Sequence, residues 1–285
     1  MKTLWRSAIL STILTATMLT AFVHQAPAQT APNGVPVLLG TTGDCNNATQ
    51  GGPCTQTSTL VQVDPRTGAL VTTIGPVGFT VNGLAWDVTS NKLYATTAVG
   101  DVAYHGLITI DPLTGAGTPV DATLFNFGLG PDPQFVLGSP IHSISIDSAG
   151  NMVGWFNKLG PGVTDTFVTI DKTTGIARAF PNTGISTRTN GVSFAKHDFL
   201  WNVAPGIAYL LDPANGQPVS SKTLSPPQPA ALGDIDPVGN QYYGLNFAVG
   251  SPTTSLQVVD LKKGTVTTVG RTVDDLHTLA FVKHL

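Results

Sequence analysis

The sequence predicts an all-β fold, a five-bladed β-propeller of four-stranded antiparallel blades closed by the C-terminal strand. Three observations predict it. The 285 residues include no Glu, whereas 31 Gly and 21 Pro make the chain a poor helix former with an ample supply of turn residues. One β-hairpin motif recurs along the chain, and a second motif alternates with it. The last segment of the chain also supplies a strand that the first segment lacks.

The chain carries few charges, with 11% charged residues and a formal net charge of −3. An average soluble domain has about 25% charged residues. The composition excludes a helical bundle, a coiled coil and a doubly wound α/β fold. The lack of Glu excludes every mechanism that needs a glutamate. No excess of basic residues is available for phosphates, so we expect no nucleic-acid partner.

Residues 1–28 have the pattern of a signal peptide. Lys2 and Arg6 precede a mostly apolar run from Ala8 to Val23, and Ala26-Pro27-Ala28 offers small residues for cleavage. An uncleaved membrane anchor is the alternative, but the run is short and interrupted by Ser and Thr. We therefore expect a secreted protein, periplasmic or extracellular, with no transmembrane segment in the mature chain and a single propeller domain at residues 29–285.

The chain has two cysteines, Cys45 and Cys54. In an oxidising compartment we expect them to form a disulfide that closes a small loop. Two thiolates do not complete a metal site by themselves, so a metal pair is the weaker interpretation.

The first repeated motif is a β-rich run followed by Asp, three residues and Gly. The Asp can accept hydrogen bonds from the backbone of its own turn, and the Gly can supply the positive φ that ends a hairpin turn. Five segments carry it, 41 to 60 residues apart when measured between their aspartates, which is the spacing of propeller blades. They are LVQVDPRTG (60–68), LITIDPLTG (107–115), FVTIDKTTG (167–175), AYLLDPANG (208–216) and LQVVDLKKG (256–264).

The second motif is a strand, a tight turn at an Asp and another strand, so the two motifs together make a four-stranded antiparallel unit. The predicted turns lie at Asp87, Asp147, Asp198 and Asp236. The segments are NGLAWDVTSNKLYATT (82–97), HSISIDSAGNMVGWF (142–156), NGVSFAKHDFLWNVA (190–204) and ALGDIDPVGNQYYGLNF (231–247).

The two ends of the chain complete the count of blades. HTLAFVKHL (277–285) is one more inner strand, and VPVLLGTTG (35–43) is a second strand without an inner one. We therefore expect the last strand to complete the first blade, which gives five blades. A β-sandwich is the alternative, but it does not explain a repeat in this register.

The units GLAWDVTSNKLYATT (83–97) and LITIDPLTG (107–115) resemble the repeats of secreted bacterial β-propellers of the NHL-repeat, surface-layer and lactonase-like groups. The resemblance covers nearly all of residues 35–285 and implies a propeller. It leaves the function open, because such propellers include enzymes, binding proteins and scaffolds. The calcium-dependent sugar lactonases among them resemble one another in an acidic site that includes a glutamate, and this chain has none.

The strand order separates two faces of the predicted ring. The tight turns all lie on one face, the turn face, and the long connections lie on the other, the loop face. Short and nearly alike, the turns suit a structural role, whereas variable loops on a rigid scaffold suit binding.

One group of polar residues converges at the loop face. Aligning the inner strands places Asn82, His142, Asn190, Ala231 and His277 at one equivalent position, where each inner strand begins. The functional interpretation is a ligand site in which His142 and His277 hold a divalent metal with help from the two asparagines. The structural interpretation is that these residues cap the strands and bond neighbouring loops, and Asn followed by Gly is also a common turn pair.

Asp234 is a second unusual residue. The residues at the equivalent position of the other inner strands are uncharged: Ala85, Ser145, Ser193 and Ala280. A carboxylate there must be paired, hydrated or bound to a ligand, because burying it alone is costly. The alternative is a shifted register that leaves Asp234 in a loop.

The function is less well defined than the fold. No nucleophile-elbow, phosphate-loop or zinc-protease motif is present. The first hypothesis is a monomeric, non-catalytic secreted module or scaffold that binds a ligand or an extracellular protein. The second is a metal-assisted hydrolase or lyase at the loop face. A glycosidase that works with two aspartates is a third.

Overall fold

A computed structural model describes residues 36–43, 57–97, 106–123, 141–157, 163–180, 182–187, 190–227, 231–247 and 253–283. The predicted signal peptide and both cysteines, Cys45 and Cys54, lie outside these residues, so the cleavage and the disulfide stay predictions. Within the described part of the chain, no helix has the length and apolar character needed to cross a membrane.

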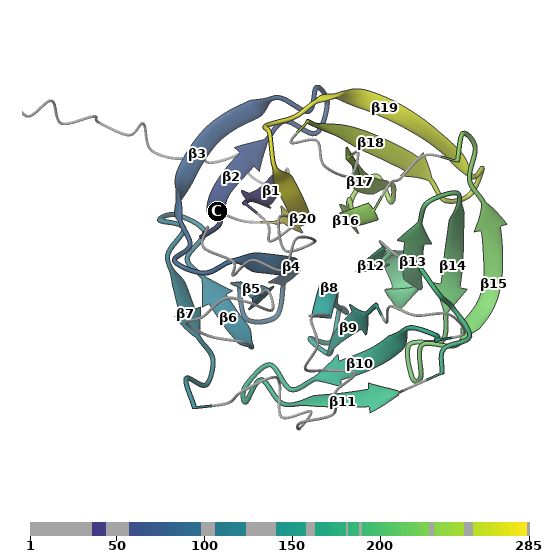
Figure 1. Ribbon diagram of the computed structural model, residues 1–285, viewed down its shortest axis with the longest axis horizontal. Coiled ribbons are helices and arrows are strands. Elements are labelled where there is room, and N and C mark those ends of the chain that lie inside the picture. The colour runs from purple at the N-terminus through teal and green to yellow at the C-terminus, as the bar shows by residue number, and fades with distance from the viewer. Residues whose placement is uncertain are drawn as a thin grey trace, which may run out of the picture.

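Five four-stranded antiparallel sheets form a ring around a central axis (Figure 1). From the axis outward, the first blade is β20 (Leu276–Val282), β1 (Val37–Thr42), β2 (Thr59–Val63) and β3 (Leu70–Pro76). The second is β4 (Val81–Asp87), β5 (Lys92–Thr97), β6 (Leu107–Ile110) and β7 (Gly117–Pro119). The third is β8 (Ile141–Ile146), β9 (Met152–Phe156), β10 (Thr166–Ile170) and β11 (Ala177–Phe180). The fourth is β12 (Gly191–Phe194), β13 (Leu200–Ala204), β14 (Ile207–Leu211) and β15 (Pro218–Thr223). The fifth is β16 (Ala231–Ile235), β17 (Tyr242–Phe247), β18 (Thr254–Asp260) and β19 (Thr265–Arg271).

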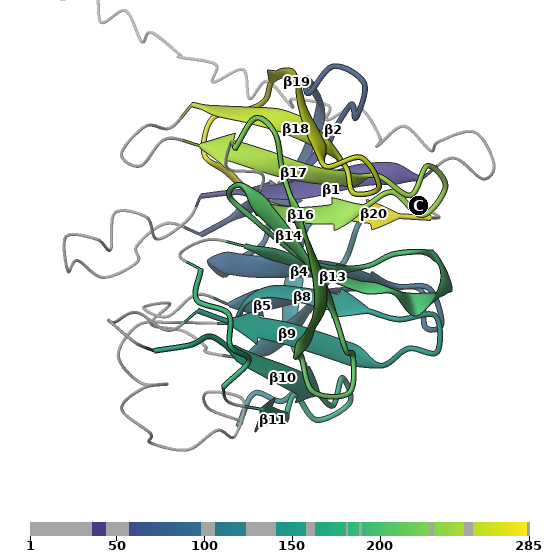
Figure 2. The same ribbon diagram turned by 90° about the vertical axis from the view of Figure 1, so that its right-hand side faces the viewer.

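The predicted closure of the ring is confirmed. The C-terminal strand β20 pairs antiparallel with β1, which lies beside it in both views (Figures 1 and 2). All seven residues of β20 are buried. The first blade is therefore assembled from both ends of the described chain.

The hairpin turns of the first motif form as predicted. Each motif Gly has a positive φ, between 73° and 82°. In each turn the Asp carboxylate accepts a hydrogen bond from the backbone N–H two residues later, as Asp64 does from Arg66 at 2.9 Å. The sequence folds this way because the Asp satisfies the turn's backbone and the Gly tolerates the left-handed conformation.

The hydrophobic core lies between the blades. The described residues form five buried apolar clusters, and each cluster joins side chains of two neighbouring blades. Trp155 of the third blade, for example, packs with Val192 of the fourth. Because each blade covers its neighbours, the ring buries its apolar faces only when it is complete.

A row of side chains ties the inner strands to one another near the turn face. Ser145 Oγ accepts the N–H of Phe194 at 2.9 Å, and Ser193 Oγ accepts the N–H of Ile235 at 3.0 Å. Asp234 Oδ2 accepts the N–H of Phe281 at 2.8 Å. An inner strand has one edge without a strand partner, and these side chains satisfy its N–H groups.

One alternative from the sequence was wrong, and one predicted turn differs in its side-chain bonds. Asn82-Gly83 is not a turn, because both residues lie inside β4, and Gly83 is needed where β8 approaches: a Cβ there would lie 3.3 Å from the carbonyl oxygen of His142. The tight turn predicted at Asp198 is present, with the N–H of Ala195 donating to the carbonyl oxygen of Phe199, but the side chain of Asp198 does not cap it. Asp198 ends a short 3₁₀ helix, Lys196–Asp198, and its carboxylate accepts bonds from the N–H and hydroxyl of Ser148 in the neighbouring blade.

Candidate functional site

The loop face is where the five inner strands begin, and three of these strands carry the same irregularity there. In β4 the pairing with β5 skips Asn82, in β8 the pairing with β9 skips His142, and in β20 the pairing with β1 skips His277. Each of these residues is the extra residue of a β-bulge, which kinks the strand and re-aims a side chain. The orientations of Asn82, His142 and His277 are therefore set by the same kind of β-bulge in three blades.

The other two members of the predicted ring are placed differently. Asn190 comes directly before β12, whose pairing with β13 is regular. Ala231 begins β16, and the extra residue of that strand falls further along, between Ala231 and Asp234, where Leu232 has a φ of 53°.

The two histidines are close enough to influence each other's charge. Burial lowers the pKa of His142 to about 4, and the positive charge of His277 contributes in the same direction. His142 is therefore a neutral imidazole at neutral pH, and its Nδ1 is buried with no hydrogen-bond partner among the described residues. A neutral imidazole can bind a metal ion or accept a hydrogen bond from a ligand.

Asn190 is held by a network of loop residues. Its Nδ2 donates to Asn157 Oδ1 at 2.7 Å and to Thr187 Oγ1 at 2.5 Å. Thr187 in turn donates through its N–H and its hydroxyl to the buried carboxylate of Asp165. These bonds favour the structural interpretation for Asn190, whose Oδ1 is nevertheless buried without a donor among the described residues. The buried carboxylate of Asp165 thus holds Thr187, and through it Asn190, in place.

Asp234 lies in the row that the sequence alignment assigned to it, in a strand and not in a loop. Its Oδ1 accepts the Ser193 hydroxyl at 2.5 Å and the N–H of Ile235 at 2.8 Å, and its Oδ2 accepts the N–H of Phe281. Burial raises the pKa of this carboxyl above its ordinary value, although the hydrogen bonds act in the opposite direction. The carboxylate lines a cavity at the turn face, so it does not belong to the histidine group at the loop face.

The residues of the loop face can supply two imidazoles and amide oxygens to a metal. Among the described residues, no group of three or more His, Cys, Asp or Glu side chains could hold a metal ion. A metal at His142 and His277 would keep open positions for water or for a ligand.

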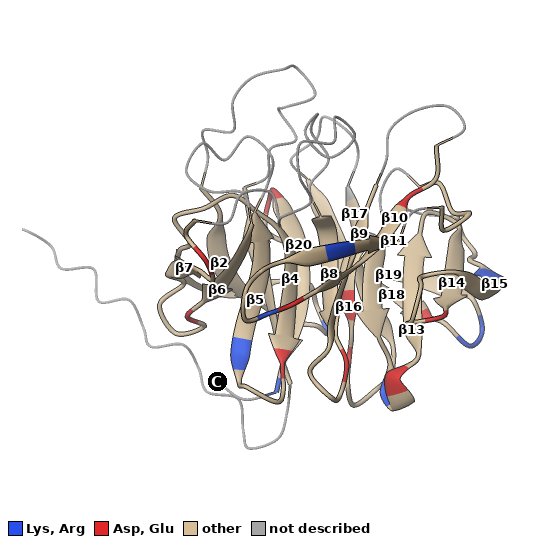
Figure 3. Ribbon diagram, turned by 90° about the horizontal axis from the view of Figure 1, so that it is seen from below, with Lys and Arg blue, Asp and Glu red and all other residues tan. Residues whose placement is uncertain are grey.

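The turn face differs from the sequence-based expectation that it is only structural. A cavity of about 190 Å³ lies there, lined by residues from all five blades. Figure 3 shows several acidic and basic positions along the lower edge of the ring, where the tight turns are. No motif in the sequence indicates this cavity, because its lining residues are far apart along the chain.

No protein-family model matches the chain. No curated protein sequence matches it. Among solved structures, the chain is similar to regucalcin, a calcium-binding protein from Agrobacterium tumefaciens, with 14% identity, a TM-score of 0.43, and coverage of 88% of this chain and 79% of that one. It is also similar to a candidate 6-phosphogluconolactonase from Bacteroides uniformis, with 14% identity, a TM-score of 0.43, and coverage of 85% and 84%. A third is virginiamycin B lyase from Staphylococcus aureus, with 12% identity, a TM-score of 0.35, and coverage of 67% and 70%. Likeness at these levels carries no argument about function, and the five-bladed fold is established by the strand pairing of the chain itself.

Proposed function

We propose that this protein is a secreted, non-catalytic binding module that holds a ligand at the loop face through His142 and His277. One observation carries the proposal: three blades each insert a single extra residue at the same position, and the residues are Asn82, His142 and His277. A bulge interrupts the hydrogen-bond ladder, so its repetition in three blades favours a role for the re-aimed side chains.

The chemistry of these side chains favours a divalent transition metal, alone or as part of the ligand. Imidazole nitrogen and amide oxygen suit zinc or copper better than calcium, which prefers sites made of oxygen alone. His142 is neutral at neutral pH because burial and the charge of His277 lower its pKa to about 4. Its unpartnered Nδ1 is a free lone pair or N–H at the site.

The test uses zinc chloride in titration calorimetry with the mature protein. We expect weak binding by the wild type and at least about a tenfold weaker affinity in the double variant His142→Asn, His277→Asn, since losing imidazole ligands removes more than about 1.4 kcal/mol of binding free energy. Asparagine already stands at the equivalent positions 82 and 190, so the chain itself indicates that the substitution is compatible with the fold.

The matched control is His197→Asn. His197 is exposed on the turn face and has a φ of 62°, which asparagine tolerates. This variant should bind zinc like the wild type. Equal zinc affinity in the wild type and the double variant, or no binding by either, would assign the histidines to a structural role.

A metal-assisted hydrolase or lyase at the same place is the second candidate. The observation that favours it is the neutral His142 beside His277, because two imidazoles leave open metal positions at which water can be activated. Turnover of a chromogenic ester by the zinc-loaded wild type, lost in the double variant, would favour this enzyme. Zinc binding without turnover of such substrates would favour the binding module.

A further inference from the structure

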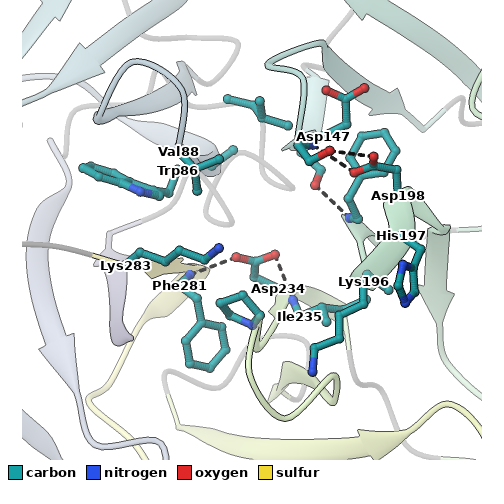
Figure 4. A pocket seen from close by; sticks show the side chains of 17 residues that line it. Trp86, Val88, Asp147, Lys196, His197, Asp198, Asp234, Ile235, Phe281 and Lys283 are labelled. Carbon is teal, nitrogen blue, oxygen red and sulfur yellow. Dashed lines mark hydrogen bonds between the residues drawn. The ribbon is translucent and has the colours of Figure 1, made fainter. Parts of the chain in front are cut away.

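The cavity at the turn face is large enough for a small organic molecule. Its volume is about 190 Å³, whereas a cavity of about 150 Å³ is enough to hold benzene. The ends of the inner strands enclose it, with Trp86, Phe194 and Phe281 among its aromatic lining residues and Asp234 among its polar ones (Figure 4). The residues of the proposed loop-face site take no part in it.

Asp234 presents an acceptor to this cavity. Its side chain is half-buried, and its two oxygens accept three hydrogen bonds, two at Oδ1 and one at Oδ2. An ionised carboxylate has about four acceptor positions, so one position at Oδ2 stays open. A desolvated carboxylate gains most from a positively charged donor, because a charge-assisted hydrogen bond replaces the lost hydration.

The structural work of Asp234 does not need a charge. In the third and fourth blades the same inter-blade bond to a backbone N–H is made by the neutral hydroxyls of Ser145 and Ser193. Serine at position 234 would serve the N–H of Phe281 in the same way. The negative charge is therefore an additional feature of this blade, and burial acts against it.

The lining of the cavity holds more carboxylates than ammonium groups. Asp147 and Asp198 line the same cavity, and the charge of Asp236 is felt at Asp234. Hydrogen bonds within the chain already engage the carboxylates of Asp147 and Asp198 and the ammonium of Lys196, which donates to the carbonyl oxygen of Val238.

Lys283 is the other ammonium group of the lining. It has no hydrogen bond or ion pair to any described residue, and Figure 4 shows its ammonium pointing toward the Asp234 carboxylate. This ammonium is thus directed toward the Asp234 carboxylate without forming an ion pair with it.

The aromatic part of the lining suits the body of such a ligand. A cation within about 6 Å of an aromatic face is attracted by the ring, and the rest of the molecule would contact apolar surface. Trp86 is 8% exposed, so only a small part of its surface is open to a ligand, and most of the ring packs in the core between the first and second blades.

We propose that the turn face contains a second, independent binding site for a small organic amine, whose ammonium group binds Asp234 and whose body packs among Trp86, Phe194 and Phe281. Lys283 competes with the ligand for Asp234. The site lies at the opposite face from His142 and His277, so it does not depend on the function proposed above.

The test uses three probes of similar size in calorimetric or NMR titrations at neutral pH: benzylamine, benzyl alcohol and benzoate. We expect the wild type to prefer benzylamine over both other probes. Asp234→Ser should weaken benzylamine binding at least about tenfold, because it removes a charge-assisted hydrogen bond. The variant should remain folded, since serine retains the inter-blade bond to Phe281 and Ile235 N–H still bonds Ser193. Asp234→Asn, which keeps the size of the side chain, should lose the same preference.

A variant of Lys283 should change the affinity for benzylamine in the opposite direction. Lys283→Met removes the competing ammonium and keeps the length of the side chain, so benzylamine should bind more tightly than to the wild type. The His142→Asn, His277→Asn variant should bind benzylamine like the wild type, which separates this site from the loop face. The proposal is overturned if benzylamine shows no preference over benzyl alcohol, if Asp234→Ser binds it with unchanged affinity, or if Lys283→Met does not tighten binding.

Discussion

At the residue scale, burial acts on three groups with different outcomes. It lowers the pKa of His142, where the charge of His277 acts in the same direction. It raises the pKa of Asp234, where hydrogen bonds only partly oppose it. At Asp87 burial also opposes ionisation, but bonds from Lys172, Ser90 and Thr89 outweigh it and hold the pKa of that carboxyl below its ordinary value. Of the three groups, only Asp87 has hydrogen bonds that outweigh the effect of burial on its pKa.

The pKa of His142 predicts a pH dependence of stability. The unfolded chain binds a proton at this residue near the ordinary value of 6.5, whereas the folded protein binds it only at about 4. The unfolded state therefore holds more protons in this window, and stability falls as the pH falls through it. Between about pH 7 and about pH 5 the wild type should lose about 2 kcal/mol through this residue.

Urea denaturation of the wild type and His142→Asn at both pH values checks this. The variant should lack the loss, and the contribution of Asp234, which has the opposite sign, cancels because both proteins carry it. The same pH slope in the wild type and His142→Asn would contradict the assignment.

At the element scale, neighbouring blades are joined by side chains from their tight turns as well as by apolar packing. Lys172 in the β10–β11 turn of the third blade pairs with the buried Asp87 at the end of β4 in the second blade. Asp87 also accepts bonds from the hydroxyls of Thr89 and Ser90. A charged group with several donors fixes both turns, so this contact is more than a surface ion pair.

Replacing Lys172 by Met should therefore destabilise the protein by about 2 kcal/mol, the size of a lost hydrogen bond to a charged group. The control is Lys263→Met, which removes an ion pair with Asp260 in the equivalent turn of the fifth blade. Lys263 is 74% exposed, so this variant should lose no more than about 0.5 kcal/mol. Chemical denaturation of both variants measures the two losses, and equal losses would show that the inter-blade pair has no special role.

Local signals explain what the sequence could predict. An Asp and a Gly four residues apart determine a hairpin by short-range hydrogen bonds, so five hairpins and the register of the blades follow from the repeat. The position shared by Asn82, His142 and His277 also came from the alignment. The bulges could not be predicted, since one extra residue at the start of a short strand does not visibly change the alternation of apolar and polar residues. The turn-face cavity could not be predicted either, although the charge of Asp234 among Ser and Ala neighbours was a signal of it.

At the scale of the whole molecule, the ring has two faces with different chemistry. The loop face presents two coupled imidazoles on bulged strands, and the turn face presents a carboxylate in a cavity that aromatic residues partly line. Both sites use residues of several blades, and both include the C-terminal strand, through His277 at its start and Phe281 near its end. Closure of the ring is thus a condition for both proposed sites as well as for the fold.

Deleting residues 277–285 tests that dependence. It removes nearly all of β20, including the buried Leu279, Phe281 and Val282. Each fully buried side chain of this kind contributes about 1.5–3 kcal/mol, and their sum approaches the total stability of about 5–15 kcal/mol of a typical native protein. The deletion also exposes edges of β1 and of the neighbouring inner strands, which favours aggregation. We therefore expect an unfolded or aggregated product by gel filtration and circular dichroism, whereas removal of His284 and Leu285 alone should leave a monomer. A deletion protein that stays monomeric and melts at the wild-type temperature would contradict closure by β20, because the first blade would then be stable without its inner strand.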